Sequence, residues 1–181
     1  MKLTIIELLM YLQIPVVWYL FRRYGKKDVS GSMIAGFLIG IFNEFATEPL
    51  WDYHLGLNIY KDTPFAILLC WAVMFTVVVS LSDWLYRTVL KKDALDPHDK
   101  RILLFDVAAA VVIAFPMETL CLKLGIWSYR LDKLNWDWGN IPLLGMPWEA
   151  LVGYCLFMLI GPSFVRAWET QFSFMKIGGG A

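Results

Sequence analysis

Residues 64–85 read PFAILLCWAVMFTVVVSLSDWL, and this stretch decides the fold class because Asp83 is its single charged residue. A helix needs about 20 consecutive apolar residues to cross the hydrocarbon core of a bilayer. The whole chain has 181 residues, of which 59% are hydrophobic and 18% are charged. Soluble domains have about half apolar and about a quarter charged residues. We therefore expect an all-α, multi-pass integral membrane helical bundle.

Four further apolar runs lie on either side of this stretch. They cover residues 3–21, 30–50, 102–124 and 147–165. Together the five runs predict about five transmembrane helices within a single domain of residues 1–177. The first run is expected to be a span, because no small-residue cleavage site of a signal peptide accompanies it. The Gly-Gly-Gly-Ala sequence of residues 178–181 is expected to form a flexible tail.

The segments between the runs differ in charge and aromatic content. Residues 22–27 and 87–101 are rich in Lys and Arg, whereas residues 51–63 and 126–146 are rich in Trp and Tyr. The positive-inside rule assigns basic segments to the cytoplasmic side. The sequence thus predicts a non-cytoplasmic N-terminus, a cytoplasmic C-terminus and two aromatic segments on the non-cytoplasmic side.

The order of residues indicates an internal repeat with halves at residues 30–87 and 101–167. Each half carries a glutamate near the end of its first run, Glu44 or Glu118, then a Trp-x-Tyr segment, and then a proline that begins its second run. Two crossings per half give both halves the same orientation, so they would be parallel repeats about an axis along the membrane normal. The interface between them is the expected place for a pocket.

Acidic residues near the outer ends of the runs are the candidate catalytic groups. A charged group at the centre of a membrane costs at least ~2.5 kcal/mol, and such groups usually face the interior of a bundle. We expect Glu44, Glu118 and Glu149 to converge on one cavity, with Glu48 pointing the same way as Glu44. Glu118 and Glu149 are the candidate acid and base, with Glu44 and Asp52 in support. The alternative is that these groups are hydrated and hold helices together.

Two other acidic residues lie near the cytoplasmic ends of the runs. Asp83 and Asp106 are expected to pair with Arg87 and Arg101, which are close to them in the sequence. This pairing would be structural.

Aromatic residues of the two outer segments complete the candidate site. Their ring faces can stabilise a cation in a site that contains little water, although anchoring at the membrane interface is a common alternative role. The candidate substrate-binding residues are Trp51, Tyr53, Trp127, Tyr129 and Trp148.

Several classes of function are excluded by composition. Equal numbers of basic and acidic residues, 16 of each, argue against a nucleic-acid partner. The two histidines, His54 and His98, are too few for a histidine-rich iron site, and no nucleotide-binding glycine motif is present. We expect no cofactor and no metal. Gly36 and Gly40 form a Gly-x-x-x-Gly pattern that favours close helix packing and would allow a homo-oligomer.

One segment has the pattern of a known family. Residues 125–129 read Gly-Ile-Trp-Ser-Tyr, and residues 144–149 read Leu-Gly-Met-Pro-Trp-Glu. This pattern resembles the repeat of the small membrane lycopene cyclases, in which a Gly-x-Trp-x-Tyr segment precedes a Pro-x-Glu-Glu segment. The similarity extends over residues 115–155 and more weakly over residues 42–75.

The resemblance implies non-redox chemistry on a long isoprenoid, started by proton transfer to a double bond, with carboxylates as the essential groups. Glu149 matches the first glutamate of the Pro-x-Glu-Glu segment, and Trp127 and Tyr129 match the aromatic pair. The sequence departs from the family where Ala150 replaces the second glutamate and where Ala66 is the counterpart of Glu149. Five spans are also fewer than the six or seven that such enzymes usually have.

The sequence thus favours an integral membrane enzyme that binds an isoprenoid or similar apolar lipid and cyclises, isomerises or hydrates it. One alternative is a small proton-coupled transporter. Another is a lipid-binding or assembly subunit whose polar groups pair with a second membrane chain.

Overall fold

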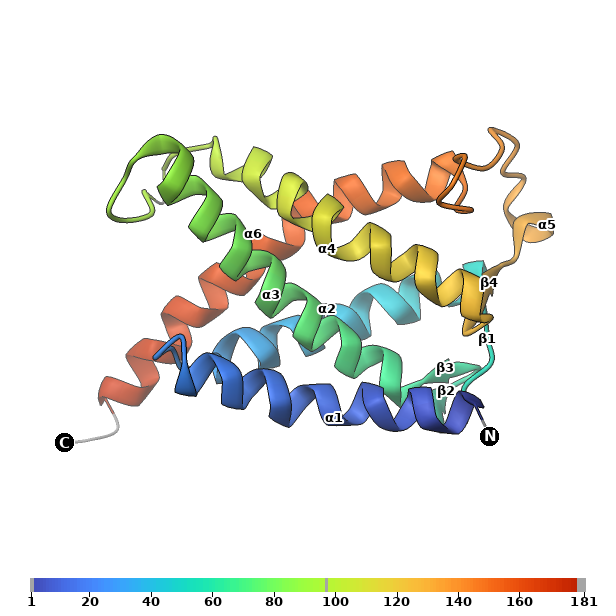
Figure 1. Ribbon diagram of the computed structural model, residues 1–181, viewed down its shortest axis with the longest axis horizontal. Coiled ribbons are helices and arrows are strands. Elements are labelled where there is room, and N and C mark those ends of the chain that lie inside the picture. The colour runs from blue at the N-terminus through green and yellow to red at the C-terminus, as the bar shows by residue number, and fades with distance from the viewer. Residues whose placement is uncertain (1, 97, 179–181) are drawn as a thin grey trace.

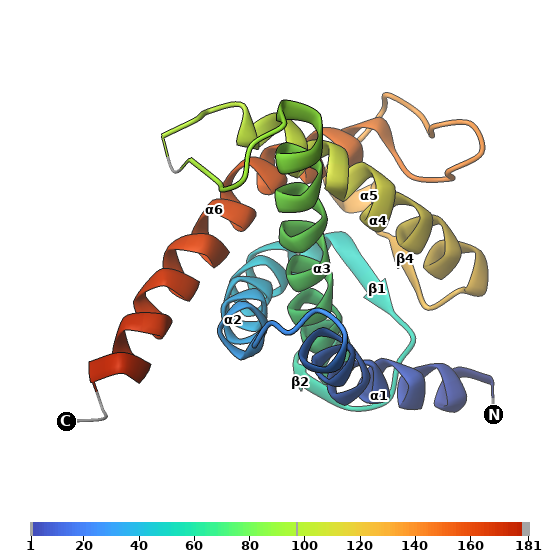
Figure 2. The same ribbon diagram turned by 60° about the vertical axis from the view of Figure 1, so that its left-hand side comes forward.

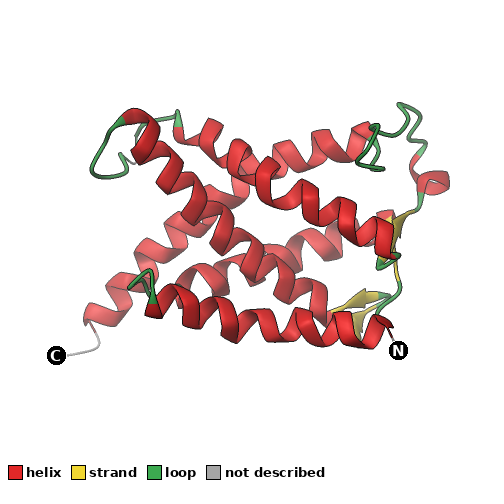
Figure 3. Ribbon diagram, in the orientation of Figure 1, coloured by secondary structure: helices red, strands yellow, loops and turns green. Residues whose placement is uncertain are grey.

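The computed structural model describes residues 2–96 and 98–178, and helices make up most of this part of the chain (Figure 3). Its long helices are α1 (Lys2–Arg23), α2 (Ser30–Thr47), α3 (Phe65–Leu90), α4 (Ile102–Leu124) and α6 (Trp148–Gly178). Its short elements are the 3-10 helix η1 (Glu48–Leu50), the strands β1 (Trp51–Tyr53), β2 (Asn58–Tyr60), β3 (Thr63–Pro64) and β4 (Trp127–Tyr129), and the helix α5 (Leu131–Leu134). The expected tail lies outside the described residues except for Gly178, which ends α6.

The long helices run between two ends of an elongated bundle. Successive long helices alternate in direction, and the strands and α5 gather at the end where the chain begins (Figure 1). The segments that follow α1 and α3 lie at the opposite end, together with the end of α6. Helix α3 lies in the middle and contacts α1, α2, α4 and α6 (Figures 1 and 2).

Four helices of the described residues are long and apolar enough to cross a membrane. They cover Ile5–Arg23, Phe65–Leu90, Ile102–Leu124 and Trp148–Gln171. The run at residues 30–50 forms α2, which is not among them, and its last three residues turn into η1. The expected all-α, multi-pass membrane architecture therefore rests on four apolar helices.

Polar and apolar side chains are distributed as in a membrane protein. Leu8, Leu104 and Ile160 are exposed on the outside of the bundle, at 56%, 72% and 66% of their surface. Glu44 and Glu118, by contrast, are 2% and 3% exposed. Contiguous exposed apolar surface marks contact with a membrane or a partner, so the outer surface of these helices is suited to lipid.

Gly36 and Gly40 allow α2 to lie against α3. A Cβ atom added at Gly40 would lie 2.5 Å from the Cβ of Trp71, and one at Gly36 would lie 3.0 Å from the Cα of Ala72. The Gly-x-x-x-Gly pattern is thus used for packing within the chain, and it lends no support to the homo-oligomer that it was expected to allow.

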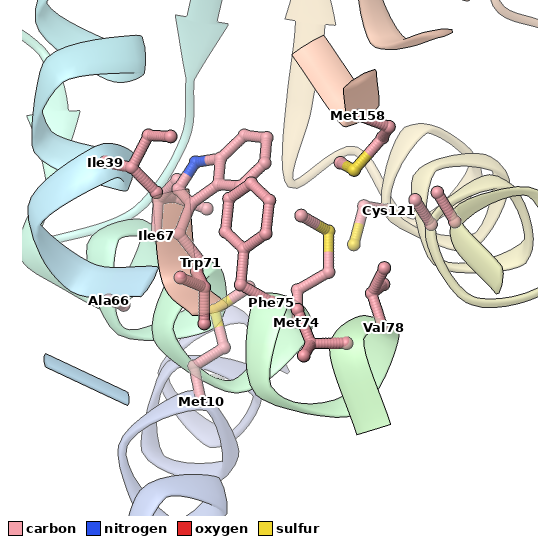
Figure 4. Packing of buried hydrophobic residues seen from close by; sticks show 14 of the residues in the cluster. Met10, Ile39, Ala66, Ile67, Trp71, Met74, Phe75, Val78, Cys121 and Met158 are labelled. Carbon is pink, nitrogen blue, oxygen red and sulfur yellow. The ribbon is translucent and has the colours of Figure 1, made fainter. Parts of the chain in front are cut away.

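The core is filled by side chains of α3 and its neighbours. Figure 4 shows Trp71, Met74 and Phe75 of α3 between Ile39 of α2 and Cys121 of α4. Close packing continues at Gly161 of α6, where an added Cβ would lie 2.4 Å from a ring carbon of Phe75. This packing fixes Trp71 at the centre of the bundle.

Strands β1 and β4 pair antiparallel and join the two expected halves at one end of the bundle. The Trp of each Trp-x-Tyr segment lies opposite the Tyr of the other, and the middle residues face each other. A twofold axis through the middle pair would produce this register. The pairs are Trp51 with Tyr129, Asp52 with Ser128, and Tyr53 with Trp127.

Candidate acid–base site between the two halves

A cavity lies where the β1–β4 sheet meets the long helices. Both acidic residues in its lining, Glu44 of α2 and Glu118 of α4, are buried. Its aromatic lining consists of Trp51, Tyr53, Trp71, Trp127 and Tyr154. The cavity therefore combines two carboxyl groups with a wall of aromatic rings.

Glu44 lies in the last turn of α2 and accepts hydrogen bonds from two aromatic side chains. The hydroxyl of Tyr53 donates to Oε2 at 2.5 Å, and the Nε1 of Trp71 donates to Oε1 at 2.6 Å. A buried carboxyl group needs such partners because leaving it without hydrogen bonds would cost several kcal/mol. Strand β1 and helix α3 thus hold Glu44 from two sides.

Glu118 lies in the last two turns of α4 and accepts three hydrogen bonds from aromatic side chains. The Nε1 of Trp127 and the hydroxyl of Tyr129 donate to Oε1 at 3.0 Å and 2.6 Å. The hydroxyl of Tyr154 donates to Oε2 at 2.8 Å. Strand β4 and helix α6 therefore hold Glu118 as β1 and α3 hold Glu44.

The two arrangements use matching positions of the sequence. Trp71 lies seven residues after Pro64, and Tyr154 lies seven residues after Pro147. Their rings are stacked with centroids 6.4 Å apart and an interplanar angle of 24°. Each half thus contributes a glutamate, a strand tyrosine and an aromatic residue at the same place in its second helix.

The donor types determine where a proton can be held. A tryptophan Nε1 only donates, so Oε1 of both glutamates must accept, whereas a tyrosine hydroxyl can either donate or accept. A proton on Oε2 of Glu44 can be donated to the hydroxyl of Tyr53, and a proton on Oε2 of Glu118 to the hydroxyl of Tyr154. Each glutamate can therefore gain or lose a proton without losing its bond to tryptophan.

A second cavity adjoins the first. Trp51, Trp71 and Tyr154 line both cavities. Glu149, in the first turn of α6, lines the second cavity and accepts a hydrogen bond from the backbone N–H of Trp138 to Oε1 at 2.8 Å. Its Oε2 atom is buried and has no hydrogen-bond partner in the described part of the chain.

The structure separates the three glutamates that were expected to share one cavity. Glu44 and Glu118 share the first cavity, whereas Glu149 lines the second. Glu149 lies in the first turn of α6, which begins after the long segment that follows α5, and Trp51, Trp71 and Tyr154 line both cavities. Of the expected substrate-binding residues, Trp51, Tyr53 and Trp127 line the first cavity, and Trp51 and Tyr129 line the second.

Asp52 and Trp148 line neither of these cavities. Asp52 is the middle residue of β1 and points away from the core, where it forms an ion pair of 3.3 Å with Arg130. Trp148 begins α6 and is 41% exposed. The alternation of side chains along a strand explains Asp52, because its neighbours Trp51 and Tyr53 both face inward.

Glu48 belongs to a group of charged residues outside the cavity. The expectation that it points the same way as Glu44 is wrong, because the helix changes to the 3-10 helix η1 at Glu48. Its carboxylate lies 2.6 Å from the Nζ of Lys61 and 3.7 Å from Arg130. The hydrogen bond from Lys61 lowers the pKa of Glu48 below its usual value. Arg130 also contacts Asp62.

A second buried polar group joins α3, α4 and α6 toward the other end of the bundle. Arg166 donates to both oxygens of Asp106, at 2.9 Å and 2.6 Å, and to Asp83 at 2.9 Å. The expected pairing of these aspartates with Arg87 and Arg101 is wrong. The Arg101 guanidinium binds Asp99 in the loop instead, with Nη2 at 2.6 Å.

Sequence reasoning missed three residues at these sites, Trp71, Tyr154 and Arg166. The internal repeat contained the signal for two of them. When the halves are superposed on Pro64 and Pro147, Trp71 and Tyr154 fall at one position. An aromatic pair at equivalent depths in two facing helices is a candidate for the wall of a shared pocket.

No protein-family model, curated protein or solved structure matches this chain significantly. Among residues 2–96 and 98–178, no three His, Cys, Asp or Glu side chains are grouped so that they could hold a metal ion.

Proposed function

We propose that the chain is an integral membrane enzyme that performs non-redox acid–base chemistry on an isoprenoid or a similar apolar lipid. The observation that carries this proposal is the cavity into which two buried glutamates, each bound by aromatic donors, both face. An acid and a base that line one aromatic pocket are the groups needed to protonate a carbon–carbon double bond and to end the reaction.

We assign the acid to Glu44 and the base to Glu118. Glu118 accepts three hydrogen bonds, which suits an ionised carboxylate because that form only accepts. Glu44 accepts two, so fewer donors stabilise its ionised form and it is the better suited of the two to hold a proton. Glu149, which the sequence favoured as acid or base, lines the other cavity and takes no part in this step.

The reaction then proceeds through a carbocation. Glu44 transfers its proton to one carbon of a double bond, and the electron pair of that bond forms the new C–H bond. The rings of Trp51, Trp71 and Trp127 stabilise the positive charge on the other carbon. Attack by a second double bond closes a ring. Glu118 then removes a proton from a neighbouring carbon, so the product has the mass of the substrate. Attack by water, followed by proton loss to Glu118, gives a product heavier by one water.

The same proposal includes five spans, with α2 as the second. An 18-residue helix is about 27 Å long, and α2 extends between the same two ends as its neighbours (Figure 1). Its polar residues Asn43 and Glu44 face the cavities, so they need not contact lipid. The basic segments at residues 22–27, 87–96 and 98–101 lie at the end opposite the strands (Figure 1), which supports a non-cytoplasmic N-terminus and a cytoplasmic C-terminus.

Apolar packing separates the glutamates of the first cavity from the ion pairs of Arg166, and this favours an enzyme over a proton-coupled transporter. Met74, Phe75 and Val78 of α3 lie between Trp71 at the cavity and Asp83 at the Arg166 group. These three side chains are 4%, 0% and 0% exposed. Since this apolar layer separates the two sets of ionisable residues, the cavity is suited to chemistry at one end of the bundle.

The proposal is tested by expressing the chain in a host that makes linear isoprenoids and analysing the apolar lipids by mass spectrometry. We expect a new product with the substrate's mass or one water heavier. Glu44→Gln and Glu118→Gln should each lower its yield by about 100-fold or more, in line with the usual contribution of general acid–base catalysis.

Glu48→Gln is the matched control, because Glu48 lies one turn after Glu44 but outside the cavity. Its product yield should stay near that of the unmodified chain. Folded Glu44→Gln and Glu118→Gln variants with full yield would overturn the proposal. So would the lack of any new product in hosts shown to contain the candidate substrates.

A further inference from the structure

The second cavity contains polar groups that the acid–base chemistry does not use. Oε2 of Glu149 is buried without a partner, while Oε1 is held in place by the backbone N–H of Trp138. The side-chain amide of Asn43 lines the same cavity and has no hydrogen-bond partner within residues 2–96 and 98–178. Buried polar groups are nearly always hydrogen-bonded, so an unpaired acceptor that lines a cavity points to a ligand.

These two side chains define the ligand group by their hydrogen-bonding capacity. The free oxygen of Glu149 needs a donor, and the amide of Asn43 offers both N–H donors and a carbonyl acceptor. An ammonium group could donate to Glu149 and to the carbonyl of Asn43, but it would leave the N–H donors of Asn43 without an acceptor. A hydroxyl group can donate to Glu149 and accept from Asn43. The polar pair therefore fits an alcohol.

The rest of the lining is apolar and aromatic. It includes Leu50, Trp136, Ala150 and Phe157, together with the three residues shared with the first cavity. Small-molecule sites are lined mainly by apolar and aromatic side chains with a few polar groups, and this cavity has that composition. The ligand is thus an amphiphile with one hydroxyl group and a hydrocarbon body.

The polar pair is present in one half of the repeat only. Asn43 and Met117 occupy the positions just before Glu44 and Glu118, and Ala66 is the counterpart of Glu149. Met117 lines the first cavity and Ala66 is fully buried. The halves therefore match at the two glutamates and differ at the place where an unsymmetrical ligand would have its polar end.

We propose that the second cavity binds the hydroxyl end of the substrate through Glu149 and Asn43, and that the substrate is an isoprenoid alcohol. This inference rests on the proposed function, because the alcohol bound here is taken to be the molecule whose double bond reaches Glu44. Binding one end fixes the orientation of the chain in a site whose two acidic residues are otherwise similarly placed. Glu149 and Asn43 are thus substrate-binding residues, distinct from the acid and the base.

The test measures the binding of two probes to the purified full chain in lipid nanodiscs. Geranylgeraniol carries a hydroxyl group, and its methyl ether has the same hydrocarbon chain but no hydrogen to donate. A hydrogen bond to a charged acceptor corresponds to about a ten- to hundredfold change in affinity. We expect the unmodified chain to bind the alcohol at least about tenfold more tightly than the ether.

The variants separate the polar pair from the rest of the cavity. Glu149→Leu and Asn43→Leu should remove most of the preference for the alcohol and leave ether binding nearly unchanged. Glu149→Gln keeps the shape of the side chain and one acceptor, so it should retain a smaller preference for the alcohol. This variant also serves as the test if Glu149→Leu does not fold. Glu48→Gln, which lies outside both cavities, should keep the full preference.

Equal affinity for the two probes, or a preference that persists in folded Glu149→Leu, would overturn the inference. Its failure can be told apart from failure of the proposed chemistry. If the chain shows no preference for the alcohol but converts hydrocarbons without a hydroxyl group, the hydroxyl site is contradicted and the acid–base reaction is retained. If the chain prefers the alcohol but converts no isoprenoid, the alcohol-binding site is retained and the proposed reaction is contradicted.

Discussion

Asp83 of α3 and Arg166 of α6 form an ion pair of 2.9 Å, and both lie nineteen residues after the proline that precedes their helix. Trp71 and Tyr154, twelve residues earlier in the same two helices, also meet each other. Equivalent residues contact one another only near a twofold axis. These pairs, with the middle pair of the β1–β4 sheet, support the proposed parallel repeat. The two equivalent positions carry opposite charges, an aspartate in α3 and an arginine in α6, so the contact between them is attractive.

Replacement of Arg166 by methionine should strongly destabilise the bundle. Arg166 is the only described basic residue within salt-bridge distance of Asp106, whose side chain is fully buried. Removing one partner of a buried ion pair costs about 3–5 kcal/mol because the other charge stays unpaired. The free energy of unfolding in mixed micelles should fall by this amount.

Arg87→Ala is the control for this prediction, because Arg87 was the expected partner of the aspartates and is exposed. Its effect should be within about 0.5 kcal/mol. Adding Asp83→Asn and Asp106→Asn to Arg166→Met should recover part of the loss. Equal effects of the Arg87 and Arg166 substitutions would contradict the network.

A methyl group at Gly40 should also lower stability. The added Cβ would lie 2.5 Å from the Cβ of Trp71, an atom fixed by the backbone of α3. Overpacking of this kind usually costs about 1–3 kcal/mol. Gly153→Ala is the matched control for stability, because a Cβ there has nothing within 4 Å. Thermal unfolding of both variants measures the difference, and the prediction fails if Gly40→Ala is as stable as Gly153→Ala.

Hydrophobic runs predicted most of the helices, because a span must be apolar over a length set by the bilayer. The second run was harder to assess. Helix α2 is packed against α3 through Gly36 and Gly40, so its stability depends on contacts that hydropathy does not measure. The Gly-x-x-x-Gly pattern indicated close packing correctly, but its partner helix could not be identified from a single sequence.

The candidate site was predicted in part for a similar reason. Buried glutamates are costly, so Glu44 and Glu118 could be recognised by type and position alone. The placement of Glu149 in another cavity depends on where α6 begins after the long segment that follows α5, and hydropathy does not determine this. The ion pair of Asp106 with Arg166 joins residues 60 positions apart, whereas sequence reasoning favoured the nearest arginines.

Removal of the Tyr53 hydroxyl should slow the proposed reaction without unfolding the protein. Tyr53→Phe keeps the ring in the cavity wall and deletes the group that can accept a proton from Oε2 of Glu44. Product yield should fall by about two- to tenfold, the usual effect of one hydrogen bond between uncharged groups, because Glu44 holds its proton before the transfer. Tyr60→Phe, on the exposed strand β2, should have no such effect. Similar yields from the two variants would argue against a role for the Tyr53 hydroxyl.

The proposed orientation predicts which loops react with a membrane-impermeant maleimide. With Cys70, Cys121 and Cys155 replaced by alanine, Asp137→Cys should be labelled in intact cells. Asp93→Cys should be labelled only after the membrane is opened. Both positions are exposed, so access depends on the side of the membrane. The reverse labelling pattern would invert the topology.

The ion pair of Glu48 with Lys61 predicts a pH-dependent contribution to stability on the strand side of the bundle. The hydrogen bond from Lys61 lowers the pKa of Glu48 in the folded chain below its ordinary value of 4.5. Folding therefore favours the ionised form, and the stabilisation is fully present above about pH 4.5 and is lost as the pH falls through the lower folded pKa.

The melting temperature of the unmodified chain should consequently exceed that of Glu48→Gln at neutral pH, and the difference should shrink as the pH falls below 4.5. Lys61→Met should remove most of the pH-dependent part of this difference, because it removes the main cause of the lowered pKa. The hydrogen bond with Asp62 and the charge of Arg130, 3.7 Å from Glu48, account for the remainder. A difference that stays constant over the acidic range would mean that Glu48 contributes through packing of η1 and not through its charge.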